Sequence, residues 1–94
     1  MPKYKLATTS TFKRNYKRIK KRVYDLRLLD EIVQKLLNGE QLPANNKDHA
    51  LSGSWVGYRE CHIQSDWLLV YKILEDRLIL TLTRTGTHSD IFNE

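Results

Sequence analysis

Residues 57–83 read GYRECHIQSDWLLVYKILEDRLILTLT. Residues 57–63 alternate between two kinds of side chain, as a strand with two different faces does. The faces are Tyr58, Glu60 and His62 on one side and Arg59, Cys61 and Ile63 on the other. Residues 67–73 are nearly all apolar, which is typical of a central strand buried on both sides. The stretch predicts an antiparallel meander, completed by turns at Ser65-Asp66 and Glu75-Asp76 and a third strand at 78–83.

A short strand and a basic helix are predicted before this meander. Residues 3–8 alternate polar and apolar side chains, which indicates a strand with one solvated face. Thr9 or Ser10 can then cap a helix, because each carries a side-chain oxygen for the free N–H groups of the first turn. The apolar stripe of this first helix consists of Phe12, Tyr16, Ile19 and Val23.

The second helix is predicted over residues 25–38. Asp25 stands at its start, and Gly39 is a natural C-terminal stop. Its apolar positions keep helical spacing and are Leu26, Leu29, Ile32, Val33, Leu36 and Leu37. Because almost no linker separates the two helices, we expect an antiparallel hairpin. Pro43 marks residues 40–46 as a loop.

These elements predict a single α+β domain over residues 1–94, with the order β-α-α-β-β-β. The two-helix hairpin would pack on a small, mainly antiparallel sheet. A composition of 40% hydrophobic and 29% charged residues is that of a globular chain rather than a disordered one. The lone Cys61 cannot form an internal disulfide or a thiolate zinc site, so we expect packing alone to hold the fold.

The sequence gives no indication of a membrane or secreted protein. No apolar run approaches the roughly 18–20 residues that a membrane span needs. Residues 1–24 also lack the apolar block of a signal peptide. We therefore expect a cytoplasmic protein with no membrane partner.

Positive charge is concentrated at the start of the chain. Residues 1–24 hold nine of the 16 Lys and Arg residues and no acidic residue, whereas the whole chain has a net charge of +5. Such a block is typical of a surface that binds a polyanion, either nucleic acid or an acidic protein segment, and a solvated helix face is the alternative. The candidate contacts to an RNA backbone are Lys13, Arg14, Lys17, Arg18, Lys20 and Lys21.

Three histidines are candidates for acid–base chemistry. His49 precedes the meander, His62 ends its first strand and His88 follows its last strand, so the meander can bring all three to one edge of the sheet. Histidine gives or takes a proton near neutral pH, which phosphodiester cleavage by general acid–base catalysis requires. Taken singly, each is more typical of a surface or structural residue. A zinc site that adds Asp66 is disfavoured, because the histidines lack helical i, i+4 spacing or cysteine pairs.

Aromatic and arginine side chains offer contacts to a nucleic acid. Trp55, Tyr58 and Phe92 can stack on unpaired bases, whereas Trp67 lies in the apolar strand and is expected in the core. Arg84 is the better candidate for a phosphate contact, because strand alternation points Arg59 away from His62.

Two runs carry a family resemblance, KDHALSGSWVGYRECHIQSDWLLVY at 47–71 and RTGTHSDIF at 84–92. Their residues and spacing, together with the chain length and element order, resemble the YafQ-type branch of the RelE/ParE toxin superfamily. The resemblance implies a RelE-like fold and a bacterial type II toxin that cleaves messenger RNA in the ribosomal A site, without a metal or cofactor. It also implies three partners: a cognate antitoxin that silences the toxin, the ribosome with its RNA, and messenger RNA.

The resemblance also implies an active site at the matching positions His49, His62, Asp66 and His88. His88 would donate a proton to the leaving oxygen, and the other three would arrange or deprotonate the attacking 2′-hydroxyl and stabilise charge. Phe92, Arg84 and Glu60 are the residues expected to contact the substrate, with Phe92 stacking on a base. Glu60 departs from the family pattern, which commonly has Asp at this position.

Two other functions remain open from the sequence. A ParE-like toxin that inhibits gyrase would share the fold, although neither it nor the RelE branch proper carries this histidine set. A non-enzymatic basic module that binds RNA or DNA would account for the charge, but not for the histidines near one edge of the sheet.

Overall fold

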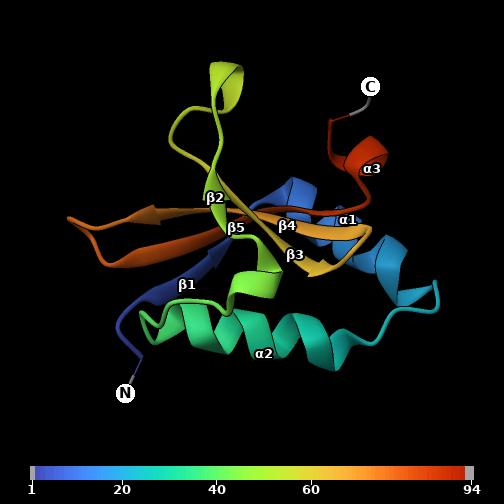
Figure 1. Cartoon of the computed structure of the whole chain (residues 1–94), viewed down its shortest axis with the longest axis horizontal. Helices are drawn as coiled ribbons and strands as arrows, with labels where there is room; N and C mark the ends of the chain where they lie inside the picture. Colours follow the sequence, from blue (N-terminus) through green and yellow to red (C-terminus); the bar gives the residue numbers. More distant parts are fainter. Residues whose placement is uncertain (1, 93–94) are drawn as a thin grey trace.

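The computed structural model describes residues 2–92 and arranges them around one five-stranded sheet (Figure 1). The strands are β1 (Lys5–Thr8), β2 (His49–Ala50), β3 (Arg59–Gln64), β4 (Trp67–Leu74) and β5 (Ile79–Gly86). The helices are α1 (Ser10–Lys20), α2 (Leu26–Leu37) and α3 (His88–Phe92). Two short 3₁₀ turns, η1 (Ala44–Asn46) and η2 (Gly53–Trp55), flank β2. None of the helices described over residues 2–92 is long and apolar enough to cross a membrane.

The sheet has the strand order β1-β5-β4-β3-β2. The pairs β2–β3, β3–β4 and β4–β5 are antiparallel, whereas β1 runs parallel to β5. The α+β class, the mainly antiparallel sheet and the predicted order of the six elements are therefore confirmed. The structure adds the two-residue strand β2 and the five-residue helix α3.

Both long helices begin at the predicted caps. The Thr9 side chain accepts a hydrogen bond from the Phe12 backbone N–H at 2.9 Å, and Asp25 accepts one from the Arg27 N–H at 3.1 Å. The apolar stripe predicted for α1 is wrong at its last position, because the helix ends at Lys20 and leaves Val23 fully exposed. Tyr24 contacts the core instead, with its ring 4.7 Å from that of Trp67.

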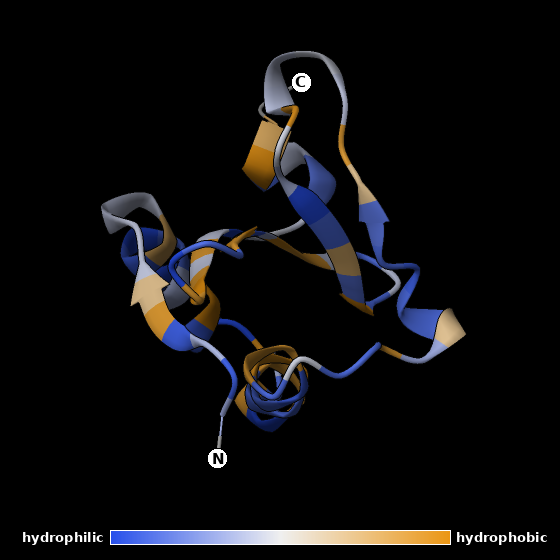
Figure 2. Ribbon diagram, turned by 90° about the vertical axis from the view of Figure 1, so that its left-hand side faces the viewer, coloured by the Kyte–Doolittle hydropathy of each residue, from blue (hydrophilic) through white to orange (hydrophobic). Residues whose placement is uncertain are grey.

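The larger core lies between the sheet and both long helices. Its most buried members include Ile19 of α1, Leu36 of α2 and Trp67 of β4. Figure 2 shows apolar residues on the side of α2 that faces the sheet. The Trp67 indole N–H donates a hydrogen bond to Thr85 Oγ1 at 2.9 Å, so this fully buried ring leaves no donor unpaired.

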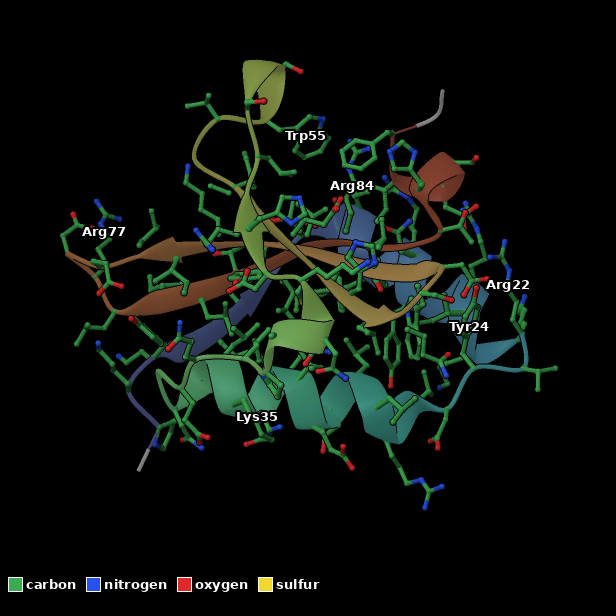
Figure 3. The ribbon with its side chains drawn as sticks, viewed as in Figure 1. Arg22, Tyr24, Lys35, Trp55, Arg77 and Arg84 are labelled. Carbon is green, nitrogen blue, oxygen red and sulfur yellow. The ribbon has the colours of Figure 1, made fainter. Side chains whose placement is uncertain are left out.

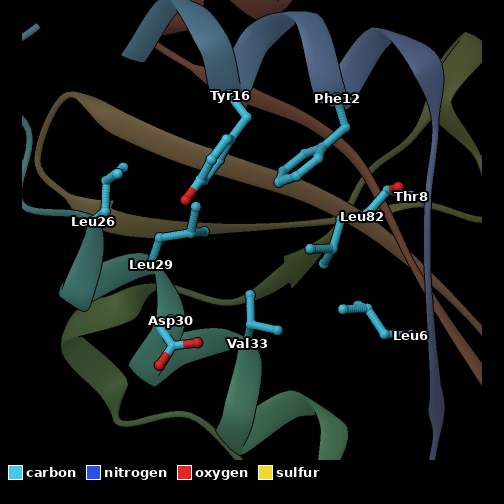
Figure 4. Close-up of a pocket in the computed structure, with 9 residues that line it drawn as sticks. All are labelled: Leu6, Thr8, Phe12, Tyr16, Leu26, Leu29, Asp30, Val33 and Leu82. Atoms are coloured by element: carbon cyan, nitrogen blue, oxygen red, sulfur yellow. The ribbon is translucent and has the colours of Figure 1, made fainter. Parts of the chain in front are cut away.

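The two long helices share this face of the sheet but frame an apolar groove. In Figure 4, Phe12 and Tyr16 of α1 and Leu29 and Val33 of α2 line opposite sides of it. Leu6 of the edge strand β1 adds an apolar side chain that is half exposed. The expected direct connection between the two helices is therefore present, but the apolar groove separates the helices from each other.

The opposite face of the sheet carries a second, smaller core. Leu68 and Val70 of β4 point to this face and pack with Ile91 of α3, whereas Trp67, Leu69 and Tyr71 point to the helices. This two-sided burial confirms β4 as the central strand predicted from its continuous apolar run. The second face also holds the residues singled out for function.

A bulge in β5 decides which face Arg84 occupies. Tyr71 pairs with Leu82 and Val70 pairs with Arg84, so Thr83 is an extra residue in the ladder. Strict alternation would place Arg84 on the helix-covered face with Leu82. Because of the bulge, Arg84 instead shares the second face with Val70.

Candidate active site

The second face of the sheet brings most of the predicted site residues into one open pocket of about 360 Å³. Glu60 and His62 come from β3, Asp66 from the β3–β4 turn, and His88 from the first position of α3. The lining also includes Ser65, Leu68, Thr87 and Ser89. Residues far apart in the chain thus meet at the end of the sheet where β3 turns into β4 and β5 leads into α3.

Glu60 joins His49 to this pocket. Its Oε1 lies 3.5 Å from His49 Nε2 and 4.0 Å from His62 Nε2, and its side chain is only 7% exposed. The antiparallel pairing of β2 with β3 places His49 directly opposite Glu60. A nearly buried carboxylate therefore stands between two imidazoles. Its second oxygen, Oε2, has no hydrogen-bond partner among the residues that the structure describes.

The backbone before β2 fixes the proton arrangement of His49. The Nδ1 atom of His49 lies 2.7 Å from the Lys47 carbonyl oxygen, which can only accept a hydrogen bond. Nδ1 must therefore carry a proton, and Nε2 is the nitrogen that faces Glu60. Lys47 reaches this geometry with a left-handed backbone, at φ 49°.

Aromatic side chains form a wall beside the pocket. The Phe92 ring lies 4.8 Å from the His88 imidazole and 5.5 Å from the indole of Trp55, which also packs edge-on against Tyr58. The Arg84 guanidinium stands 5.0 Å from the centre of the Trp55 ring and donates a hydrogen bond to the Ile91 carbonyl at 2.7 Å. Figure 3 shows Trp55 and Arg84 on the side of the sheet away from α2.

Arg59 lies on the other face of β3, as alternation predicted. Its Nε donates to Asp48 Oδ1 at 3.3 Å, and the Tyr71 hydroxyl donates to the same oxygen at 2.6 Å. Burial and the Asp48 carboxylate both raise the pKa of Tyr71, so its hydroxyl remains a donor. This network holds Asp48, the residue before His49, in place. It also keeps the Arg59 side chain on the face of the sheet opposite the pocket.

Cys61 is excluded as a nucleophile. It is completely buried beneath the helices, and burial raises the pKa of its thiol to about 12. Only a thiolate is an effective nucleophile, so the thiol is inert near neutral pH.

The basic residues predicted on α1 are exposed, but they do not form one uniform surface. Lys13, Lys17 and Lys20 line a separate hollow along α1, together with Phe12 and Tyr16. Arg18 instead lies 3.6 Å from Asp90 of α3, and Arg22, just beyond α1, lies 2.9 Å from the same carboxylate. This connection between α1 and α3 was not predicted from the sequence, although Thr87-x-x-Asp90 matches a helix-capping pattern that could have drawn attention to Asp90.

The side chains of the pocket do not form a ready metal site. Over residues 2–92, no group of three His, Cys, Asp or Glu side chains is arranged to hold a metal ion. Imidazoles and carboxylates lie at several positions around one open pocket, and side chains of these types can give and take protons.

Comparisons with known proteins agree with this fold. The family model described as "Bacterial toxin of type II toxin-antitoxin system, YafQ" matches residues 4–93. A relative from Escherichia coli K12, "mRNA interferase toxin YafQ", is 44% identical over 82 residues, which are 86% of this chain and 87% of the relative.

Two solved structures extend the comparison. YafQ in the E. coli DinJ-YafQ toxin-antitoxin complex has a TM-score of 0.87 and 36% identity, covering 96% of this chain and 98% of that one. A metal-bound toxin from Helicobacter pylori has a TM-score of 0.89 and 37% identity, covering 95% and 99% of the two chains. The family model spans almost the entire sequence, and the chain belongs to the YafQ family of type II toxin-antitoxin toxins.

Proposed function

We propose that this toxin is an endoribonuclease that cleaves messenger RNA on the ribosome by general acid–base catalysis, without a metal ion. The observation that carries the proposal is the convergence of His62, Asp66 and His88 on one pocket, with His49 linked to it through Glu60. The mRNA interferase activity of the E. coli relative supports the same substrate class.

The reaction needs one base, one acid and a means of stabilising negative charge. A base removes the proton of the 2′-hydroxyl, whose oxygen attacks the neighbouring phosphorus. The bond from phosphorus to the 5′-oxygen breaks, and an acid protonates that oxygen. The products are a 2′,3′-cyclic phosphate and a free 5′-hydroxyl, and no redox or metal step is required.

His88 is the proposed acid, because it is exposed at the mouth of the pocket and no carboxylate ion pair ties it down among the described residues. His49 is suited to accept a proton at Nε2, since the Lys47 carbonyl holds the proton on Nδ1. His62 and Asp66 line the pocket and arrange the 2′-hydroxyl. Glu60 is nearly buried, so it acts by orienting His49 and His62.

Two side chains are proposed to hold the substrate beside these groups. Phe92 stacks on a base of the RNA, adjacent to His88. Arg84 uses one Nη to bind the Ile91 carbonyl, which leaves further N–H donors on its guanidinium for a phosphate oxygen.

The exposed lysines of α1, and Lys21 at its C-cap, support ribosome binding. Lys13, Lys17, Lys20 and Lys21 can contact ribosomal RNA phosphates without reading sequence, which suits a protein that docks on a folded RNA surface. The same positive surface favours an acidic, partly disordered antitoxin segment that folds on binding. The DinJ-YafQ complex supports an antitoxin partner.

The proposal is tested by brief expression of the toxin followed by primer extension on cellular messages. New 5′ ends within codons of translated messages are expected, and they should disappear when the cognate antitoxin is co-expressed. Induction of a DNA-damage response without message cleavage would instead identify a gyrase inhibitor. Binding to RNA or DNA without message cleavage, unchanged by mutation of His88, would identify a non-enzymatic module.

A chelator decides the metal question. Toxin treated with EDTA and dialysed into metal-free buffer should cleave programmed ribosomes at the same rate as untreated toxin. The reaction contains Mg²⁺ because the ribosome requires it. Recovery of activity only after a transition metal is added would contradict the metal-independent reaction, and the metal-bound Helicobacter toxin makes this control informative.

A further inference from the structure

The helix that carries His88 is too short to hold its own position. Helix α3 has five residues, and isolated helices below about 12–15 residues are marginal in water. His88 and Phe92 both lie on it, so their placement depends on contacts that α3 makes with the rest of the molecule. Ile91 provides an apolar anchor in the second core, but a single buried side chain does not fix the rotation of a helix.

Asp90 supplies the directional contacts at the start of α3, whereas the hydrogen bond from Arg84 to the Ile91 carbonyl lies nearer its end. The Oδ2 of Asp90 accepts a hydrogen bond from the Thr87 backbone N–H at 3.0 Å, and its own backbone N–H donates to Thr87 Oγ1 at 3.2 Å. This reciprocal capping pair fixes the backbone immediately before His88. The same Oδ2 accepts a hydrogen bond from Arg22 Nη1 at 2.9 Å, and Arg18 lies 3.6 Å from Oδ1.

The start of α3 is also shaped around Asp90. Gly86, the last residue of β5, has φ +147°, and a Cβ on it would lie 2.8 Å from the Asp90 Cβ. A side chain at position 86 would therefore push Asp90 away. Burial opposes ionisation of Asp90, but its hydrogen bonds from Thr87 and Arg22 outweigh this effect and hold its pKa below the usual value.

Arg22 connects this turn to a distant part of the chain. It lies in the connection between α1 and α2, 68 residues before Asp90. The ion pair therefore ties the end of α1 to the start of α3, and the His88 ring itself contacts the Phe92 ring of the same short helix. A displacement of about 1 Å in a catalytic group can lower a rate by about 100-fold, so such a tie affects catalysis without touching the substrate.

We infer that Asp90, held by Arg22, is a positioning residue that aims His88 at the leaving 5′-oxygen. The inference rests on the proposed role of His88 as the acid. It assigns to the Arg22–Asp90 pair a function in the rate of cleavage, in addition to its contribution to the stability of the fold, and no function in RNA binding.

The test uses a double-mutant cycle in the full chain, read by single-turnover cleavage of programmed ribosomes. Arg22→Gln removes the ion pair and leaves the Thr87–Asp90 capping pair intact. Asp90→Asn keeps the size of the side chain and an acceptor oxygen. The matched control is the exposed Asp25–Arg27 pair at the start of α2, whose charged groups lie 3.1 Å apart, mutated to Asn and Gln in the same way. Asn caps a helix as well as Asp does, so the control variants should fold.

Each single variant should cleave about 10-fold more slowly than wild type at saturating ribosomes, with an unchanged half-saturating ribosome concentration. The double variant should be no slower than the slower single variant, and Arg22→Lys should recover part of the rate. NMR signals of the His88 ring should shift in Arg22→Gln and Asp90→Asn, because its distance from the Phe92 ring changes, and should not shift in the control pair.

Folded variants that cleave within about two-fold of wild type would overturn the inference. The inference would also be overturned if Arg22→Gln raised only the half-saturating ribosome concentration, left the cleavage rate unchanged, and combined additively with Asp90→Asn. That result would assign Arg22 to phosphate binding. If Asp90→Asn does not fold, the cleavage rates of Arg22→Gln and Arg22→Lys are sufficient to test the inference. Normal cleavage by His88→Gln would refute the proposed acid, and the NMR shifts would then still decide whether the pair positions His88.

Discussion

At the scale of single residues, the nearly buried carboxylate of Glu60 lies between two histidines. Its carboxylate lies 3.5 Å from His49 and 4.0 Å from His62, so Glu60→Gln removes the charge that orients both. Removing an orienting carboxylate costs up to about 10⁴-fold in serine proteases. The contacts of Glu60 are longer, and we expect the single-turnover rate to fall by about 10- to 100-fold.

The matched control for Glu60→Gln is Glu31→Gln, at an exposed position on α2. Both variants remove one carboxylate with little change in size. Equal cleavage by the two would show that Glu60 has no part in the reaction. Glu60→Asp should retain more activity than Glu60→Gln because the charge remains.

The residue pattern of the sequence predicted much of this arrangement. Alternation in β3 correctly separated Glu60 and His62 from Arg59 and Cys61, because a strand turns successive side chains to opposite faces. It could not predict that His49 pairs with Glu60, since β2 has two residues and no repeating pattern. Strict alternation likewise could not predict the bulge at Thr83 that places Arg84 on the second face of the sheet.

At the scale of elements, Gly86 is the joint between β5 and α3. Gly86→Ala should destabilise the fold by about 1–3 kcal/mol, because alanine at φ +147° is strained and its Cβ would approach Asp90 to 2.8 Å. Gly53→Ala is the control, since Gly53 also has a positive φ of +63° but nothing lies within 4 Å of its added Cβ. Urea unfolding should show a larger destabilisation for Gly86→Ala, and equal destabilisation by the two variants would contradict the close approach.

Acid should loosen the attachment of α3. The folded-state pKa of Asp90 lies below its unfolded value of about 3.9, so this group stabilises the fold above that pH. The contribution disappears as the pH falls through the folded pKa, while Arg22 and Arg18 remain charged. Unfolding free energies measured between about pH 5 and pH 2.5 should fall less steeply for Asp90→Asn than for wild type. Parallel pH curves would show that the ion pair has no net effect on stability.

The elements that the sequence predicted are those long enough to show a period. Helix α2 spans three turns and its apolar residues repeat at helical spacing, so the pattern correctly predicted Asp25 and Asn38 as its limits, and they form its caps. Helix α3 has one turn and offers no period. The extension of the first apolar stripe to Val23 was wrong, because spacing alone does not show that α1 ends at Lys20.

At the scale of the whole molecule, the lysines of α1 are expected to govern ribosome binding. Changing Lys13, Lys17, Lys20 and Lys21 to Gln should weaken binding and flatten its salt dependence, by up to about one unit of slope for each phosphate that is no longer neutralised. Arg18 is left unchanged because it lies next to Asp90. The fold should survive, since these four residues are exposed and Gln is a good helix former.

The control for this charge removal changes Lys3, Lys5, Lys35 and Arg77 to Gln, which removes the same total charge from other elements. Binding by both variants is measured over a salt titration. If the affinity of the two variants falls equally, net charge rather than the α1 surface governs binding. If the α1 variant binds like wild type, its lysines are a solvated face only.

The arrangement of these surfaces in space was beyond the sequence. The predicted hairpin did not reveal that an apolar groove lies between α1 and α2, or that Arg22 reaches across to α3. Contacts between residues 68 positions apart depend on how the elements pack, and the local composition of the sequence does not predict them. The resemblance to a family pointed to the histidines of the pocket without showing what holds them.

The central claim is that His88 delivers the proton to the leaving oxygen, and His88→Gln tests it most directly. Glutamine keeps a comparable size and a hydrogen-bond donor but cannot act as an acid. With saturating toxin on programmed ribosomes, a single-turnover measurement isolates the chemical step from binding. We predict that His88→Gln binds the ribosome and the antitoxin normally but cleaves about 10²- to 10⁴-fold more slowly. Equal rates for wild type and His88→Gln would contradict this role of His88.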